Sequence, residues 1–289
     1  MLKHLIDQAT KPERVVILGS AGFVGNACTQ RLKAMDIPVL ELPRTELDLT
    51  DSKSGDLLAD LLRPNDSLLF VSAKAPVKTE SMLIDNLQMA STVCYAIRES
   101  PPQHLVYISS DAVYADSDNP LDESSCAQPG SLHGIMHLAR EVMLKNAWQG
   151  PLCFLRPTLI YGAEDPHNGY GPNRFIRLAQ KGEEISLFGE GEELRDHVWI
   201  EDVADLTYRV LVHQSTGIMN IATGTVVSFR GIAEQVTQLI PNSSQIKGSP
   251  RTGPMPHNGY RAFDPAATYQ AFRDFTYTNL KDGLRKVHG

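Results

Sequence analysis

The chain has 289 residues, of which 42% are hydrophobic and 21% are charged, and this composition is typical of a globular protein with a sizeable core. Its net charge of −7 argues against nucleic acid as a partner, and it lacks an apolar run of the roughly 18 residues that would cross a membrane. The four cysteines show no paired spacing, which favours a reducing, cytoplasmic location.

The first recognisable element is a run of four aliphatic residues at 15–18, which predicts a buried parallel strand. Glycines follow at positions 19, 22 and 25, and residues 26–35 then predict a helix. A strand, a glycine-rich turn and a helix start form a dinucleotide site, because Gly19 permits a tight turn, Gly22 lets the backbone approach a pyrophosphate and Gly25 allows close packing. The alternative is a glycine turn without a ligand.

Similar strands and helices alternate along the next 130 residues. Further strands are predicted over residues 39–42, 67–71, 105–108 and 152–157. Further helices are predicted over residues 57–62, 82–99 and 174–180. This alternation predicts an α/β protein with a doubly wound parallel sheet.

Three motifs carry a family resemblance. Residues 19–25 read Gly-x-x-Gly-x-x-Gly, residues 156–162 read Arg-Pro-Thr-Leu-Ile-Tyr-Gly, and residues 187–204 end in Asp-His-Val-Trp-Ile-Glu-Asp-Val-Ala. In order and spacing they resemble the extended short-chain dehydrogenase/reductase family over about residues 14–275. Its members are NAD(P)-dependent epimerases, dehydratases, reductases and decarboxylases that act mostly on nucleotide sugars. The resemblance implies a nucleotide-sugar-like substrate and a homodimer.

The resemblance also implies a domain division. We expect an NAD(P)-binding Rossmann domain over residues 1–156, with a returning segment near residues 196–223. Residues 157–289 would form mainly a small α/β substrate-binding region.

The end of the second strand bears on the cofactor. An acidic residue there would bind the ribose of NAD, but this chain has Pro43 followed by Arg44. Because an arginine suits a 2′-phosphate, we expect a preference for NADP; alternatively, Arg44 is a solvated surface residue. Residues 43–51 resemble NADP-dependent members of the family, and by that resemblance Asp48 and Leu49 would face the adenine.

The resemblance places a set of further residues against the cofactor. Besides the three glycines, Arg44, Asp48 and Leu49, this set is Ala21, Phe23, Val24, Ser72, Ala73, Lys74, Asn86, His137, Pro157 and Leu159.

The catalytic positions depart from the family. Family members use a serine or threonine, a tyrosine that transfers a proton and a lysine four residues later. Ser110 matches the serine, but the other two positions fall on His133 and His137. In one interpretation His133 is the general acid/base, with a reference pKa of about 6.5, and His137 contacts the ribose. In a second, oxidoreduction has been lost. A third, a metal on this histidine pair, lacks an evident third ligand, so we predict no metal.

Other substitutions narrow the reaction. Asp111 is present, but Ala112 replaces the glutamate of the family's dehydratases, which disfavours sugar 4,6-dehydration. Members that epimerise with a cysteine and a histidine have those residues where this chain has Ala112 and Arg174. Asp111 is the next candidate proton donor after His133.

Substrate contacts are predicted on the second half of the chain. Arg174 and Arg195 are candidates for a substrate diphosphate, because guanidinium groups fit phosphate oxygens. The resemblance adds Tyr161 and Asn173, together with Ser110. Alternatively, Arg195 is surface charge beside acidic residues.

One pentapeptide occurs twice. Pro-His-Asn-Gly-Tyr stands at residues 166–170 and again at 256–260. Asn-Gly is a common turn sequence, so this repeat is either chance reuse of a turn or a pair of loops at the rim of the substrate pocket.

Together these features predict an NAD(P)-dependent reductase or epimerase for a nucleotide-sugar-like substrate, with atypical catalytic residues. One alternative is a non-catalytic NADP-binding sensor or regulator of the same fold. The other is an atypical RNA-binding relative, which the acidic charge disfavours.

Overall fold

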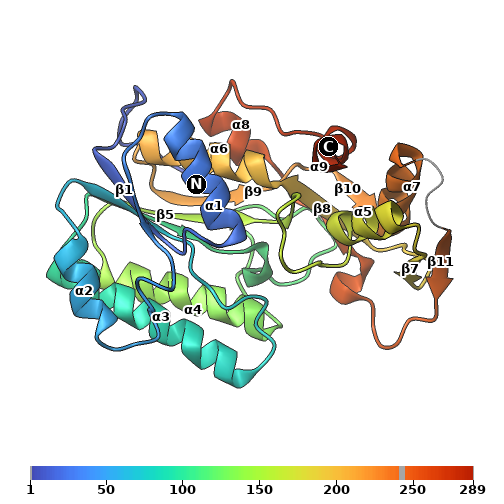
Figure 1. Cartoon of the computed structure of the whole chain (residues 1–289), viewed down its shortest axis with the longest axis horizontal. Coiled ribbons are helices and arrows are strands. Elements are labelled where there is room, and N and C mark those ends of the chain that lie inside the picture. Colours follow the sequence, from blue (N-terminus) through green and yellow to red (C-terminus); the bar gives the residue numbers. More distant parts are fainter. Residues whose placement is uncertain (1, 241–244, 289) are drawn as a thin grey trace.

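Six parallel strands form the central sheet of this computed structural model, which describes residues 2–240 and 245–288. Their order across the sheet is β2-β1-β3-β4-β5-β9 (Figure 1). They are β1 (Arg14–Leu18), β2 (Val39–Leu42), β3 (Asp66–Phe70), β4 (His104–Ile108), β5 (Leu152–Pro157) and β9 (Gly217–Ile221). The predicted doubly wound parallel sheet is confirmed.

Helices cover both faces of this sheet, which buries its strands on two sides (Figure 1). One face carries α1 (Phe23–Ala34) and α6 (Ile200–Val212). The other carries α2 (Ser54–Leu61), α3 (Glu80–Glu99) and α4 (Leu132–Ala147). The strand order reverses between β1 and β3, and in such sheets a crevice opens at that point beyond the carboxyl ends of the strands.

A smaller body follows β5 and has its own apolar core. Its main sheet contains β6 (Leu159–Tyr161), β8 (Leu194–Trp199), β10 (Val226–Ser228) and β12 (Tyr260–Arg261), and β7 (Ile185–Phe188) pairs separately with β11 (Ile246–Ser249). The helices of this part of the chain are α5 (Pro172–Lys181), α7 (Phe229–Leu239), α8 (Ala266–Ala271) and α9 (Leu280–His288). After β8 the chain returns through α6 to the central sheet, where β9 pairs with β5.

Helix starts differ from the sequence prediction by a few residues. The helix expected at residue 26 begins at Phe23, directly after the turn, with Gly22 as its N-cap. The helix expected at residue 174 begins at Pro172, because proline fits the first turn of a helix, where its missing N–H is not needed. No helix in the described ranges is long and apolar enough to cross a membrane.

His104 is a buried titratable group at the start of β4. Its side chain is fully buried, and Nε2 lies 2.8 Å from the carbonyl oxygen of Ser215. Burial lowers the pKa of His104 to about 4. The unfolded chain therefore takes up a proton near pH 6.5, well before the folded chain does.

This difference makes stability depend on pH. Neutral His104 contributes fully to the free energy of unfolding above about pH 6.5, and this contribution is lost as the pH falls toward 4. By pH 5 the loss amounts to about 2 kcal/mol. In His104→Gln the amide still reaches the Ser215 carbonyl but cannot take up a proton. The decrease in unfolding free energy between pH 7 and pH 5 should therefore be about 2 kcal/mol smaller in this variant. Urea unfolding at pH 7 and pH 5 measures it; an equal loss in both proteins would contradict the assignment.

Candidate active site

The turn between β1 and α1 is shaped by two of its glycines. Gly19 has φ +88°, a conformation that favours glycine. A Cβ on Gly25 would lie 2.1 Å from the carbonyl oxygen of Gly19, so no larger residue fits there. The turn therefore holds the start of α1 directly against the end of β1, which leaves backbone N–H groups of the helix facing outward.

A hollow of about 580 Å³ lies over this turn. Its walls contain most of the residues that the sequence places against the cofactor, namely Gly19, Ala21, Gly22, Phe23, Val24, Gly25, Arg44, Asp48, Leu49, Ser72, Ala73 and Lys74. His137, Pro157 and Leu159 line an adjoining pocket instead. We call the first space the turn hollow and the second the β4 pocket.

Asn86 lies outside both spaces and acts on the wall of the turn hollow. It is fully buried on α3, and its amide accepts from the backbone N–H of Lys74 and donates to the Lys74 carbonyl, both at 3.0 Å. Asn86 therefore fixes the loop after β3, and direct cofactor contact is not supported for its side chain.

Arg44 is held by an acidic neighbour. Its Nε and Nη2 both lie 3.1 Å from Oδ2 of Asp48, and its side chain is largely exposed. Hydrogen bonds from Thr50, and then the Arg44 charge, lower the pKa of Asp48. An incoming anion must share Arg44 with this carboxylate.

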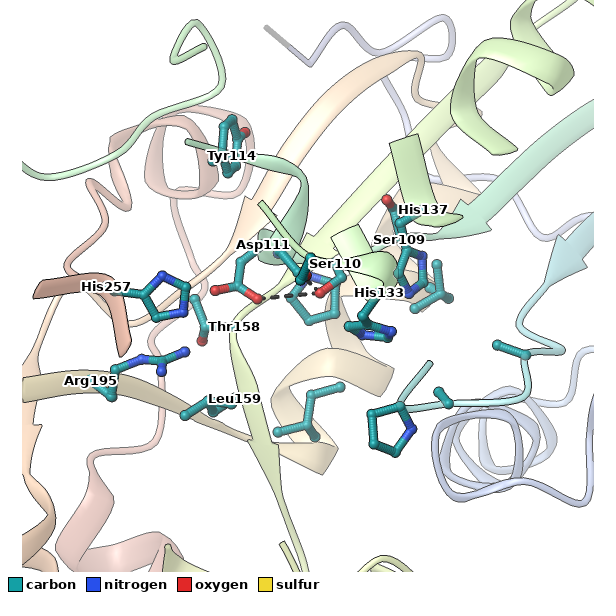
Figure 2. A pocket seen from close by; sticks show the side chains of 18 of the residues that line it. Ser109, Ser110, Asp111, Tyr114, His133, His137, Thr158, Leu159, Arg195 and His257 are labelled. Carbon is teal, nitrogen blue, oxygen red and sulfur yellow. Dashed lines mark hydrogen bonds between the residues drawn. The ribbon is translucent and has the colours of Figure 1, made fainter. Parts of the chain in front are cut away.

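The β4 pocket has a volume of about 830 Å³ and shares Val24, Val71, Ala73, Ala75 and Ile160 with the turn hollow. Such a volume suits a small-molecule ligand. The predicted residues that it brings together are Ser110, Asp111, His133, His137 and Arg195 (Figure 2).

The residues after β4 form the floor of the pocket. The Ser110 hydroxyl accepts from the N–H of Ala112 at 3.1 Å and lies 3.3 Å from Oδ1 of Asp111. Ser109 points the other way and donates to Glu141 at 2.6 Å. This buried carboxylate also pairs with Arg156, at 2.6 Å, so the end of β4 is tied to α4 and β5.

The first turn of α4 sits directly on this floor. Ser131 caps the helix by accepting from the N–H of Gly134 at 3.1 Å. A Cβ on Gly134 would lie 2.0 Å from the carbonyl oxygen of Ala112, so only glycine allows this approach. The contact places His133 at the edge of the pocket, beside Ser110 and Asp111 (Figure 2).

The two histidines have different surroundings. Nδ1 of His133 accepts weakly from the N–H of Val77 at 3.5 Å, whereas Nδ1 of His137 lies 2.7 Å from the hydroxyl of Tyr107. Burial lowers the pKa of both, and Asp111 partly offsets this for His133. The rings meet edge to face with centroids 4.7 Å apart, so protonation of one opposes protonation of the other. At neutral pH the pair is uncharged.

Three residues expected to bind substrate lie away from the pocket. Arg174 is exposed on α5 and lines neither space. Tyr161 is buried and faces Gly283 of α9. Asn173 is buried; its side chain accepts a hydrogen bond from the N–H of Gly162 and donates one to Asp165. These bonds fix the loop before α5. A substrate-binding role is therefore not supported for these three, because packing within the smaller body sets their orientation.

Sequence reasoning missed a polar cluster on the far wall of the pocket. Arg261 is fully buried and donates to Oδ2 of Asp111 at 3.0 Å and to Oδ1 of Asp116 at 3.2 Å. His257 lines the pocket beside it, and His167 lines the junction with the turn hollow. The available signal was the repeated pentapeptide, since each copy contributes its histidine to the walls.

Within the described ranges, no group of three or more histidine, cysteine, aspartate or glutamate residues is placed to hold a metal ion.

Comparison with known proteins identifies relatives of this architecture. The sequence profile of the NAD dependent epimerase/dehydratase family matches residues 15–222. The chain is 24% identical over 280 residues to a UDP-N-acetyl-alpha-D-glucosaminuronate decarboxylase from Bacillus cytotoxicus, which covers 85% of this chain and 86% of that protein.

Solved structures show the same fold. A UDP-glucose 4-epimerase from Thermotoga maritima, crystallised with UDP-glucose, superposes with a TM-score of 0.85 at 19% identity, over 95% of this chain and 97% of that one. A GDP-L-fucose synthetase from Naegleria fowleri, bound to NADP, superposes with a TM-score of 0.83 at 16% identity, over 99% and 95% of the two chains.

The contact between α4 and the floor of the pocket can be tested by stability. Gly134→Ala would stabilise an unconstrained helix by about 1 kcal/mol. Here the methyl group meets the Ala112 carbonyl, so we expect the unfolding free energy to fall by about 2 kcal/mol. Gly130→Ala is the matched control, since its Cβ meets nothing within 4 Å. Stabilisation by Gly134→Ala in urea unfolding would contradict the contact.

Proposed function

Since the chain belongs to the NAD dependent epimerase/dehydratase family, we propose that it is a nicotinamide-dependent reductase or epimerase for a nucleotide-sugar-like substrate. The observation that carries this proposal is that the turn hollow and the β4 pocket adjoin each other at one edge of the sheet. The turn hollow and the β4 pocket share a wall, and Ser110 and His133 stand in the second of them.

The turn hollow fits the cofactor. The close approach of Gly25 to Gly19 leaves N–H groups at the start of α1 to meet a pyrophosphate, and the first turn of this helix carries no acidic residue. Arg44 lines the hollow and supports the proposed preference for NADP through the 2′-phosphate. When bound, the cofactor supplies the hydride chemistry.

Proton transfer falls to the residues around Ser110. The weak bond from Val77 to Nδ1 of His133 leaves Nε2 as the ring nitrogen for a substrate oxygen. As imidazolium, His133 gives its Nε2 proton to a carbonyl oxygen. To accept a proton from a hydroxyl at Nε2, the neutral ring must carry its own proton on Nδ1, which replaces the weak contact with Val77. Ser110 holds the same oxygen by a hydrogen bond.

Arg195 is the proposed anchor for the substrate diphosphate. Its side chain is largely buried on β8 and lines the β4 pocket, and Nη1 donates to Glu193 at 3.0 Å. That ion pair positions the guanidinium group and leaves further N–H donors for phosphate oxygens.

We propose a homodimer that buries the outer face of α3 and α4. Ile84 on α3 and Val142 on α4 are 66% and 60% exposed, and Ile135 adds a third apolar side chain one heptad before Val142. Exposed apolar side chains on two helices that pack together favour a second copy of this surface as the partner.

One observation favours the alternative of a non-catalytic NADP-binding sensor. His137 stands where the family has lysine, yet it is buried against Tyr107 and its pKa lies well below the usual range. It offers no permanent charge to a bound cofactor or to His133.

The cofactor preference can be measured directly. A charged hydrogen bond from Arg44 to the 2′-phosphate should make NADPH bind about ten- to a hundredfold more tightly than NADH, and Arg44→Ala should remove most of that difference. Asp48→Asn is a useful companion, because it frees Arg44 and should strengthen NADPH binding. Calorimetry that gives equal affinities for both cofactors in the wild type would end the NADP assignment.

The role of His133 predicts the pH dependence of turnover. Reduction of the substrate requires the imidazolium form of His133. The kcat/KM for reduction should therefore fall as the pH rises through a midpoint below about 6.5, and the kcat/KM for the reverse oxidation should rise over the same range. His133→Phe should abolish turnover of UDP- and GDP-hexoses while NADPH still binds.

The double change His133→Tyr with His137→Lys restores the family's catalytic pair and separates the two proposals. A silent wild type that gains reductase activity on restoration would support the sensor. An active wild type that is unaffected by His133→Phe would remove His133 from the mechanism.

A further inference from the structure

His257 occupies an unusual stretch of backbone in the wall of the β4 pocket. His257 and Asn258 both have φ +51°, a left-handed conformation that is unfavourable for residues other than glycine. Two such residues in succession persist only where their surroundings hold them. The short turn Pro256–Gly259 is held to the rest of the pocket through the His257 ring.

The ring is oriented by a carboxylate. Nδ1 of His257 lies 2.5 Å from Oδ1 of Asp116, and the same oxygen accepts from Nη1 of Arg261 at 3.2 Å. Arg261 is anchored in turn by Asp111, at 3.0 Å from Nε. Nη1 of Arg261 also lies 3.2 Å from Nδ1 of His257, but the Asp116 carboxylate is nearer and accepts only from a protonated Nδ1. The closer contact therefore sets the neutral tautomer, which carries its lone pair on Nε2. The ring is thereby set up as a base.

The position of this base complements His133. Figure 2 shows His257 and His133 on opposite sides of Ser110 and Asp111, and the two histidines come from different elements. Val77 donates to Nδ1 of His133, so that ring presents Nε2–H. One wall thus offers a hydrogen-bond donor and the other an acceptor.

We propose that His257, oriented by Asp116, is a second proton-transfer residue of this pocket, acting on the carbon next to the carbonyl of a nucleoside diphosphate keto-sugar. This inference rests on the proposed function, whose substrate class it makes specific. His257 is a catalytic residue in this scheme, and Asp116 is a positioning residue that acts through it.

The step balances within the pocket. Nε2 of His257 takes the proton from the carbon, the electron pair of that C–H bond forms a carbon–carbon double bond, and the π pair of the carbonyl group moves onto its oxygen. Ser110 and Nε2–H of His133 donate hydrogen bonds to the resulting enolate. Return of the proton to carbon restores the carbonyl compound, so no oxidant or reductant is consumed.

The charges around His257 suit a base at neutral pH. Asp116 and Asp111 face it with negative charge, and Arg261 and Arg195 face it with positive charge. Burial and the Arg195 charge lower the pKa of His257, and Asp116 acts against them. The neutral, proton-accepting ring therefore dominates at pH 7.

The first test uses the free protein and needs no ligand. Two-bond proton–nitrogen NMR spectra should show His257 with its proton on Nδ1 and His133 with its proton on Nε2. Asp116→Asn should lower the proton affinity of His257 about tenfold and weaken its tautomer preference. Asp118→Asn is the matched control, because it removes an equal charge from the same loop without contacting His257.

The second test measures hydrogen exchange in deuterium oxide with UDP-4-keto-6-deoxyglucose as the probe. The wild type should exchange hydrogen at carbon next to the carbonyl. His257→Gln should slow this about a hundredfold or more, Asp116→Asn about tenfold or more, and Asp118→Asn not at all. Binding of the probe is followed separately by the shift in melting temperature.

The outcomes distinguish the two proposals. Binding without exchange in the wild type, or exchange that survives His257→Gln, overturns the role of His257 and leaves the proposed function in place. Failure of UDP-4-keto-6-deoxyglucose to bind overturns the nucleotide-sugar proposal itself, and the inference with it. A His257 proton on Nε2 in the NMR spectra contradicts the orientation by Asp116.

Discussion

The buried guanidinium group of Arg140 connects the parts on which both spaces depend. It donates to the carbonyl oxygen of Asn86 at 2.9 Å, to the Asn86 side chain at 2.9 Å and to the Ser72 carbonyl at 2.8 Å. It also packs against the ring of Phe70, 4.9 Å from the centroid. A buried charge of this kind is tolerated only when its hydrogen bonds are satisfied, and removing its partners would leave it uncompensated. Helix α4 is therefore locked to the loop after β3, which forms the wall of the turn hollow.

The next residue of α4 makes the second connection. Glu141 is hydrogen-bonded to Ser109, just after β4, and to Arg156 on β5, so helix α4 is fixed to the ends of both strands. His133 and His137 stand on the same helix, two turns and one turn before these anchors. Their position over the floor of the pocket thus follows from buried polar contacts elsewhere on α4, and little of it depends on the histidines' own bonds.

Local pattern was sufficient for the central sheet and for the glycine turn beneath the turn hollow. Aliphatic runs and the glycine turn are short-range signals, and Ser110 and His133 could each be matched to a position of the family's catalytic motif. Substrate binding by Tyr161 and Arg174 stays a prediction: Tyr161 faces Gly283 of α9 and Arg174 is exposed on α5, and no local pattern describes either placement. The contact between Asp116 and His257 joins residues 141 positions apart, so it exists only in the folded chain. The repeated pentapeptide predicted a pair of loops at the pocket, but it could not predict the contact between Asp116 and His257.

The family resemblance predicts a lysine where this helix has His137, so the charge around the pocket must have another source. His137 cannot supply it, because burial, His133 and Arg140 all lower its pKa. Fixed positive charge comes instead from Arg140 behind α4 and from Arg195 and Arg261 on the far wall. A lysine beside a tyrosine would stabilise the deprotonated phenol; a guanidinium group beside a histidine favours the neutral ring. The same electrostatic surroundings therefore suit proton transfer by a histidine of low pKa, which is the role proposed for His133 and His257 on opposite walls of the pocket.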